Sequence, residues 1–307
     1  MSDVTSDLIS GVCPVLSVPF TNSGEVDYES FESLVNWIIS QGVKSVLFFG
    51  VASENIKLSD PERYKLLEIL LKVRAGSGLK VIASVADHAS ELAVKRAQDY
   101  EAMGVDLINI LPPSFFNPSA EQIRFHLAQI LGAVKIPVVI QHLPQAGGMQ
   151  DVAELLTLAD QYPNLRIVKC ESNPPEESIK RVYEITEGKV ASLIGWGGIF
   201  WESGDLAGAK GIQPGCGVTD LYKWSEAALI SGDRKEFGRR LNTFIPWISS
   251  WISNLELLIA AEKHILARRG IIASDYCRHP TVALSDQVKR EIDECLDLIE
   301  RVADGRA

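Results

Sequence analysis

Short apolar runs alternate with longer amphipathic segments along the whole chain. The short runs are rich in Val, Ile, Leu and Phe, and several are apolar at nearly every position, as in strands of a parallel sheet covered by helices on both faces. The sequence predicts eight such strands, at residues 13–20, 45–50, 79–85, 105–111, 136–141, 165–170, 190–195 and 208–213.

The segments between these runs have the period of an amphipathic helix. Residues 27–42, 60–76 and 120–134 are the clearest examples, because their apolar residues recur three and four positions apart. Each begins near Asp, Ser or Pro, and the first two run up to a Gly, which are start and stop signals of helices. Helices are therefore predicted between the strands.

Eight strand–helix units in succession predict an α/β fold in which the strands close into a TIM (β/α)8 barrel. The last strand ends near residue 213, and residues 219–304 hold about three more helical patterns, of which the first is the eighth barrel helix. We expect a single domain over residues 1–307, with the barrel at 11–232 and a C-terminal helical extension at 233–307. A doubly wound open sheet is the alternative, but no G-x-G-x-x-G motif follows the first strand.

Composition leaves this fold unchanged but excludes some partners. The chain has 307 residues, of which 46% are hydrophobic and 23% charged, as in a soluble globular enzyme. Its net charge of −10 opposes binding to nucleic acid or to an anionic membrane, because both need a cationic surface. Five widely spaced cysteines without a C-x-x-C pair indicate reduced thiols, and the N-terminus shows no export signal. A cytoplasmic protein is therefore expected.

The active site of such a barrel lies at the C-terminal ends of its strands. Lys169 is the penultimate residue of the apolar run at 165–170, and Glu171 follows that run directly. Because residues two apart in a strand face the same side, both side chains should point into the barrel. There a desolvated amine can form a Schiff base with a 2-keto acid, and the carboxylate can move protons. A lysine that reaches solvent, or a structural ion pair, is the alternative.

Two other strand ends carry candidate binding residues. The loop after the second strand presents the amides of Val51, Ala52 and Ser53, and such a turn can hold a carboxylate. The fifth strand ends in Gln141 and His142, of which one should point inward and the other into the wall.

The seventh strand ends in Gly195 and Trp196. The glycine lets the backbone come close to a ligand, and the indole could form a pocket wall, although packing alone also explains an aromatic residue there. The chain has no G-x-S-x-G nucleophile motif.

Six short motifs, taken in order and spacing, resemble those of a known family. They are VPF at 18–20, G-x-x-x-E at 50–54, LPPSFFNPS at 111–119, the turn that ends at Pro144, the strand lysine at 169, and GAKG at 208–211. Together they resemble the dihydrodipicolinate synthase/N-acetylneuraminate lyase family of class I, Schiff-base-forming barrels, over roughly residues 11–280.

The resemblance implies that Lys169 forms the Schiff base and that the loop at 50–54 holds the carboxylate of a small 2-keto acid. It also implies an enzyme without metal or organic cofactor that assembles as a homotetramer, a dimer of dimers.

Three hydroxyl-bearing positions of the family differ in this chain. Gln141 stands where members that make or break C–C bonds usually carry a Tyr, and Val51-Ala52 replaces the usual pair of hydroxyl residues in the carboxylate loop. The aromatic lid position, often Tyr, matches Phe115. The hydroxyl groups that shuttle protons in an ordinary aldolase mechanism are therefore missing.

Lys169 remains, with Glu171 as an additional acid/base. This Lys-x-Glu pair, together with Gln141, resembles the branch of the family that dehydrates L-2-keto-3-deoxyarabonate to α-ketoglutaric semialdehyde in pentose oxidation. A hydro-lyase acting through Lys169, Glu171 and Gln141 is the leading hypothesis. A pyruvate-dependent aldolase or synthase, and a catalytically silent keto-acid-binding homologue, are the alternatives.

Overall fold

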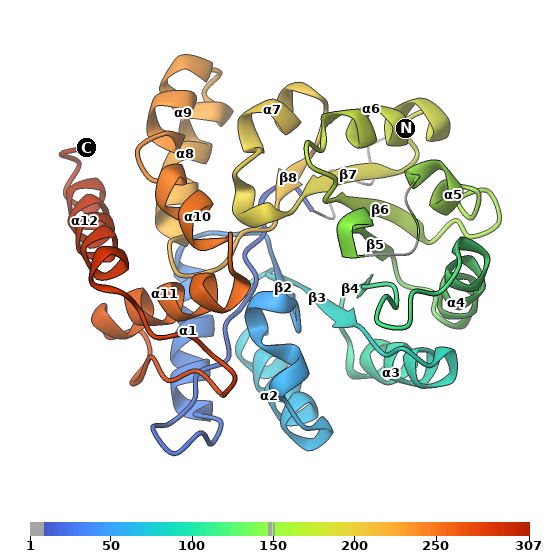
Figure 1. Cartoon of the computed structure of the whole chain (residues 1–307), viewed down its shortest axis with the longest axis horizontal. Coiled ribbons are helices and arrows are strands. Elements are labelled where there is room, and N and C mark those ends of the chain that lie inside the picture. The colour runs from blue at the N-terminus through green and yellow to red at the C-terminus, as the bar shows by residue number, and fades with distance from the viewer. Residues whose placement is uncertain (1–8, 147–148, 150) are drawn as a thin grey trace. The chain divides into compact units, whose positions relative to one another are not determined.

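The structure is a computed structural model that describes residues 9–146, 149 and 151–307 (Figure 1). The chain divides into two compact units. The first comprises residues 1–13 and 80–213, and the second comprises residues 14–79 and 214–307. The predicted single domain, with a boundary between barrel and extension at 232/233, stays a prediction.

A parallel sheet forms the centre of the first unit. Its strands pair in the order β1-β8-β7-β6-β5-β4-β3, so sequence neighbours are spatial neighbours from β3 to β8. The strands are β1 (Gly11–Val12), β3 (Lys80–Val85), β4 (Leu107–Ile110), β5 (Val138–His142), β6 (Leu165–Cys170), β7 (Ala191–Ile194) and β8 (Gly211–Ile212). Nearly all positions of β3 to β7 are buried, which explains their continuous apolar runs.

Helices follow the strands of this unit in turn. They are α3 (Ser90–Met103), α4 (Ala120–Ala133), the single turn η3 (Pro144–Ala146), α5 (Val152–Leu156), α6 (Glu176–Thr186), the turn η4 (Trp196–Gly198) and α7 (Trp201–Leu206). Helix α4 shows why they form: Ser119 and Gln122 make a capping box at its start, and Ile123, Leu127 and Ile130 form its buried face.

The second unit contains one strand and most of the C-terminal helices. Its elements are α1 (Tyr28–Ser40), β2 (Ser45–Phe48), the turns η1 (Val51–Ser53) and η2 (Asn55–Lys57), α2 (Asp60–Val73), α8 (Thr219–Ile230), α9 (Arg234–Leu241), α10 (Ile245–Trp251), α11 (Leu255–Arg268) and α12 (Asp286–Ala303). Helix α1 starts at Asp27, whose side chain accepts a hydrogen bond from the Ser30 amide, and it buries Phe31 and Leu34.

The alternation of parallel strands and helices along the chain confirms the predicted (β/α)8 barrel with C-terminal helices. The prediction of a strand at 13–20 is wrong in its bounds. Regular pairing covers only Gly11–Val12, and Val15 forms isolated parallel bridges with Leu47 and Gly215. Pro14 and Pro19 have no N–H to donate to a ladder, so a regular strand cannot run through them.

The C-terminal region contains more helices than predicted. Within the described residues, five helices (α8 to α12) follow β8, where about three patterns are expected. Helices α9 and α10 are only 8 and 7 residues long, too short for the apolar period to separate them from their neighbours in the sequence.

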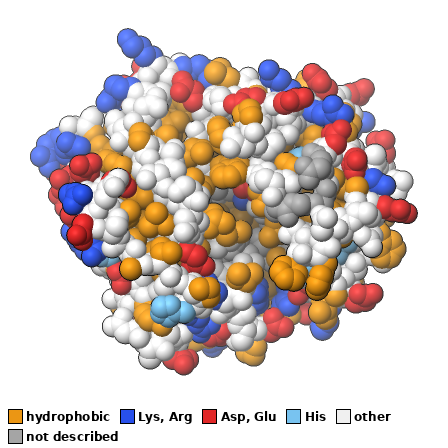
Figure 2. Space-filling view, in the orientation of Figure 1, with side chains coloured by type: hydrophobic (Ala, Val, Ile, Leu, Met, Phe, Trp, Pro, Cys, Tyr) orange, Lys and Arg blue, Asp and Glu red, His pale blue; other side chains and the backbone are white. Residues whose placement is uncertain are grey.

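Charged side chains of both signs are interspersed on the face shown in Figure 2. Within the part of the chain that the structure describes, no helix has both the length and the apolar character that a membrane span needs.

Candidate active site

The pairing of β5, β6 and β7 decides which strand-end side chains share a face. Gln141 lies opposite Lys169, which lies opposite Leu193, so these three side chains point to the same side of the sheet. His142 lies one residue further on, in register with Cys170, and therefore points to the other side.

Glu171 follows β6 and faces the same side as Lys169. Its Oε1 lies 3.4 Å from Nζ of Lys169, and both side chains are buried, with 9% and 7% exposed. Nε2 of Gln141 donates a hydrogen bond to the other carboxylate oxygen, Oε2. The structure thus brings together the amine, the carboxylate and the amide that form the predicted catalytic set.

Gly195 and Trp196, which follow β7, also lie against the Glu171 carboxylate. A Cβ on Gly195 would overlap the Glu171 carboxylate and would lie 2.6 Å from its Cγ, so only glycine fits there. The amide N–H of Trp196 lies 3.4 Å from Oε1, and its indole Nε1 donates to the Glu171 carbonyl oxygen at 2.9 Å. Both residues therefore contact Glu171 directly.

Two further predicted binding residues are not brought to this cluster. His142 lies on the opposite face of the sheet from Lys169, which makes it the member of its pair that points into the wall. Phe115 is 81% exposed and packs edge-to-face on Phe116, with ring centroids 5.1 Å apart. No contact within the described residues joins Phe115 to Lys169 or Glu171.

The predicted carboxylate loop lies in the second unit. Val51, Ala52 and Ser53 form the single turn η1, in which the Ser53 amide donates to the Gly50 carbonyl at 3.0 Å. The Ser53 hydroxyl donates to the Leu16 carbonyl at 2.6 Å and is fully buried. Both donors of Ser53 thus have partners within the protein, and its role toward a ligand stays a prediction. The amides of Val51 and Ala52 donate no hydrogen bond to any described residue.

Buried ion pairs of Glu54, the residue directly after η1, stabilise this loop. Glu54 adopts a left-handed backbone with φ of 51°, and its carboxylate binds Nζ of Lys263 and, at 3.0 Å, Nζ of Lys57. The side chains of Glu54 and Lys263 are both fully buried, and burial lowers the pKa of Lys263. Lys57 also binds Glu256 at 2.6 Å.

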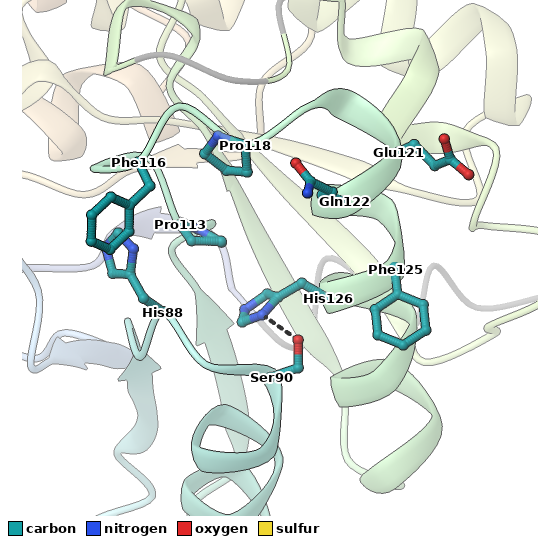
Figure 3. A pocket seen from close by; sticks show the side chains of 9 residues that line it. All are labelled: His88, Ser90, Pro113, Phe116, Pro118, Glu121, Gln122, Phe125 and His126. Atoms are coloured by element: carbon teal, nitrogen blue, oxygen red, sulfur yellow. Dashed lines mark hydrogen bonds between the residues drawn. The ribbon is translucent and has the colours of Figure 1, made fainter.

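A separate surface cavity of about 450 Å³ lies between the first turns of α3 and α4 (Figure 3). His126 and Ser90 form a hydrogen bond of 3.1 Å at its base, and His88 and Phe116 line its other side. Burial, with a smaller contribution from His88, lowers the pKa of His126, so this imidazole is neutral at pH 7. None of the predicted site residues lines this cavity.

Sequence reasoning missed Gln145. Its Nε2 donates to the Glu171 carbonyl at 2.6 Å from the turn η3, a position that no sequence motif marks. Within the described residues, no group of three or more His, Cys, Asp or Glu side chains is arranged to hold a metal ion.

Comparison with known proteins defines the class of this barrel. The model of the dihydrodipicolinate synthetase family matches residues 8–299. The chain is 27% identical over 303 residues to the 4-hydroxy-tetrahydrodipicolinate synthase of Bartonella bacilliformis, covering 94% of this chain and 97% of that protein. It is 30% identical over 185 residues to the enzyme of the same name from Methanococcus aeolicus, covering 60% of this chain and 63% of that protein.

Solved structures agree on the fold. Dihydrodipicolinate synthase from Rhodopseudomonas palustris has a TM-score of 0.85 at 23% identity, covering 95% of this chain and 98% of its own. The enzyme from Oceanobacillus iheyensis has a TM-score of 0.86 at 18% identity, covering 97% and 99%. The chain is thus a (β/α)8 barrel of the lyase class. It belongs to the dihydrodipicolinate synthetase family.

Proposed function

We propose that this protein is a Schiff-base-forming hydro-lyase that dehydrates L-2-keto-3-deoxyarabonate to α-ketoglutaric semialdehyde. The observation that supports this best is the buried pair of Lys169 and Glu171, 3.4 Å apart, with Gln141 on the second carboxylate oxygen. A base beside the Schiff-base lysine serves proton abstraction, whereas an aldol reaction needs a hydroxyl group that this site lacks.

In the first step, the neutral amine of Lys169 attacks the C2 carbonyl of the substrate. The carbonyl oxygen leaves as water, and the resulting iminium withdraws electrons from C3. Burial of the Lys169 side chain supports this step, because it limits access of bulk water to the iminium.

In the second step, the carboxylate of Glu171 takes a proton from C3, and the electron pair forms an enamine. The enamine expels the C4 hydroxyl, which takes the proton from Glu171 and leaves as water. A proton shift from C5 to C3 gives the enol of the aldehyde. The enol takes a proton at C4 and loses the one on its oxygen, and hydrolysis of the iminium releases the semialdehyde and the free lysine. Gln141 orients the carboxylate but is too weak an acid to move protons itself.

The carboxylate of the keto acid is proposed to bind the amides of Val51 and Ala52, which have no hydrogen bond of their own among the described residues. Without the threonine hydroxyls of the family, these amides supply the binding. Phe115 and His142 stay predicted contributors to substrate binding.

A pyruvate-dependent synthase is the second candidate, because the relatives from Bartonella and Methanococcus are named 4-hydroxy-tetrahydrodipicolinate synthase. The two candidates differ in their products. A dehydratase gives the semialdehyde without pyruvate, whereas aldol cleavage of the same substrate releases pyruvate.

The decisive experiment is incubation with L-2-keto-3-deoxyarabonate, with borohydride added to a parallel sample, followed by mass spectrometry of products and protein. We expect the semialdehyde, and a reduced adduct on Lys169. The variant Lys169→Ala should lose both, because it lacks the amine that forms the iminium. Glu171→Gln should keep the adduct while turnover falls on the order of 10²-fold or more.

Matched controls are Lys189→Ala and Glu184→Gln, two exposed residues of the same unit, which should leave turnover unchanged. Pyruvate as the product would make the protein an aldolase instead. An intact protein without adduct or product would identify a silent keto-acid-binding homologue, and full activity of Lys169→Ala would exclude the mechanism.

The family resemblance also supports a cytoplasmic homotetramer that acts in pentose breakdown. The widely spaced cysteines without a C-x-x-C pair support the cytoplasmic location as well.

A further inference from the structure

Both the sheet and side chains hold the backbone of Glu171. Its amide donates to the His142 carbonyl of β5 at 2.9 Å, whereas its carbonyl is bound by side chains. The last registered pair of β6 and β7 is Cys170 with Ile194, so Glu171 lies beyond the ladder. Its carbonyl oxygen nevertheless accepts two hydrogen bonds, at 2.6 Å from Nε2 of Gln145 and at 2.9 Å from Nε1 of Trp196. The two donors come from the turns η3 and η4, which follow the neighbouring strands on either side.

Trp196 contacts Glu171 through two groups, the indole N–H on the carbonyl and the backbone N–H on the carboxylate. This geometry needs a left-handed backbone at Trp196, with φ of 50°, which is unfavourable for a residue with a side chain. Gly197 and Gly198 continue with φ of 57° and 77°. Such a conformation persists only where other contacts hold it. The contacts here are those with Glu171 and two hydrogen bonds within the turn, from the Gly198 amide to the Gly195 carbonyl at 2.9 Å and from the Ile199 amide to the Trp196 carbonyl at 3.1 Å.

We propose that Trp196 and Gln145 are positioning residues, which hold the Glu171 carboxylate against Lys169 for proton transfer. The inference rests on the proposed function, in which Glu171 is the base. A glutamate side chain has three rotatable bonds. The bound carbonyl fixes where this side chain starts, and Gln141 and the Trp196 amide hold its carboxylate 3.4 Å from the lysine. This role differs from that of a pocket wall, because loss of a wall raises KM, whereas loss of positioning lowers kcat.

Hydrogen exchange of pyruvate tests the proposal without depending on the sugar acid. Pyruvate that has condensed with Lys169 exchanges its methyl hydrogens with D2O only as fast as a base removes them. The exchange rate, followed by NMR, therefore reports proton abstraction by Glu171, and borohydride trapping reports Schiff-base formation alone. Together, the two measurements distinguish proton abstraction by Glu171 from Schiff-base formation by Lys169.

Two variants remove one hydrogen bond each. Trp196→Phe keeps an aromatic ring but loses the indole N–H, and Gln145→Met keeps the length of the side chain but loses its donor. We expect the exchange rate of the pyruvate methyl hydrogens to fall about 10-fold in Trp196→Phe and about 3-fold in Gln145→Met. The rate of borohydride trapping on Lys169 and the KM for pyruvate should stay within about 2-fold of the wild type. The controls are Trp247→Phe and Gln129→Met, which lie outside the site and should change neither reading.

A rise in KM with unchanged exchange would make Trp196 a pocket wall and overturn the proposal. An equal fall in trapping and exchange would overturn it as well, since it indicates general damage. If Trp196→Phe does not fold, Gln145→Met is the deciding variant, because the Gln145 side chain is exposed and its replacement should not disturb folding. An unchanged exchange rate in Gln145→Met would contradict the inference.

Failure of the proposed function gives a different result. Wild-type protein that traps and exchanges pyruvate but forms no semialdehyde would exclude the dehydratase and leave the positioning role in place. Wild-type protein that does neither would exclude both.

Discussion

At the scale of single residues, the Glu171 carboxylate is held in place from several sides. Lys169, Gln141 and the Trp196 amide surround its two oxygens, and Gly195 lies directly beneath it. A carboxylate held by three donors cannot rotate freely, and this rigidity suits a base that must meet one particular hydrogen.

Gly195→Ala tests this close fit. The added Cβ would overlap the carboxylate, so Glu171 must move away from Lys169. We expect kcat to fall on the order of 10²-fold, while borohydride trapping of pyruvate on Lys169 continues. The assay is steady-state turnover alongside mass spectrometry of the trapped protein.

The matched control is Gly132→Ala in helix α4. A Cβ there would make only an ordinary contact of 3.6 Å with Tyr162, and alanine favours a helix, so activity should be unchanged. Normal turnover in Gly195→Ala would show that the position of the carboxylate does not limit the reaction.

Strand alternation alone predicts that Lys169 and Glu171 share a face, and they lie 3.4 Å apart. Other features of the site depend on contacts between distant segments. Ser53 donates its hydroxyl to a carbonyl 37 residues away, and the indole of Trp196 reaches Glu171 through a left-handed backbone. Neither the partner of a hydroxyl nor a positive φ at tryptophan is marked in the sequence.

At the scale of elements, the apolar runs predict the central strands β3 to β7 to within two residues at each end, because these strands are buried on both faces. The first strand departs further, since prolines break the run at 13–20. The fifth strand shows what register adds: adjacent Gln141 and His142 point to opposite sides, and only pairing with β6 tells which of them joins Lys169.

The link between the turn η1 and helix α11 allows a test at this scale. Lys263 of α11 is fully buried against Glu54, donates to the Tyr276 carbonyl at 3.1 Å and lies 4.2 Å from the centre of the Phe20 ring. We expect Lys263→Met to lower the free energy of unfolding by about 3 kcal/mol, because it leaves Glu54 with less compensation in a buried place. Urea denaturation measures this change.

A second variant separates the charge from the packing. In Glu54→Gln/Lys263→Met no uncompensated carboxylate remains, so part of the lost stability should return. Lys95→Met, which breaks the exposed pair of Lys95 with Asp99 on α3, should cost less than about 0.5 kcal/mol. Equal stability of Lys263→Met and the wild type would show that the buried pair contributes nothing.

At the scale of the whole molecule, pH acts on stability through groups whose pKa changes on folding. Glu262 of α11 is buried beside Gly215 and Gly217, both of which lack room for a Cβ because the Glu262 side chain fills the space. Burial raises its pKa from 4.5 to about 7, although the backbone amides of Cys216 and Gly217 partly offset this shift. No sequence pattern distinguishes this glutamate from an exposed one, since it lies in an ordinary helical segment.

The direction of the pH effect follows from that shift. Between pH 4.5 and pH 7 the folded protein holds a proton on Glu262 that the unfolded chain has released. The free energy of unfolding therefore falls as the pH rises through this window, by up to about 3 kcal/mol, and levels off above it. The stability that Glu262 contributes is fully present below the pKa that it has in the unfolded chain, and it is lost as the pH rises through the pKa that it has in the folded protein.

Glu262→Gln removes the titration while keeping the shape of the side chain. We expect the variant to gain stability relative to the wild type on going from pH 5 to pH 8, by up to about 3 kcal/mol, because the wild type alone must then ionise a buried carboxyl group. Urea denaturation at the two pH values measures the difference. Glu294→Gln on the exposed face of α12 should show no such dependence on pH. The free energy of unfolding of Glu262→Gln could instead differ from that of the wild type by the same amount at pH 5 and at pH 8. Glu262 would then not titrate in this range, and the two loop amides would hold it ionised throughout.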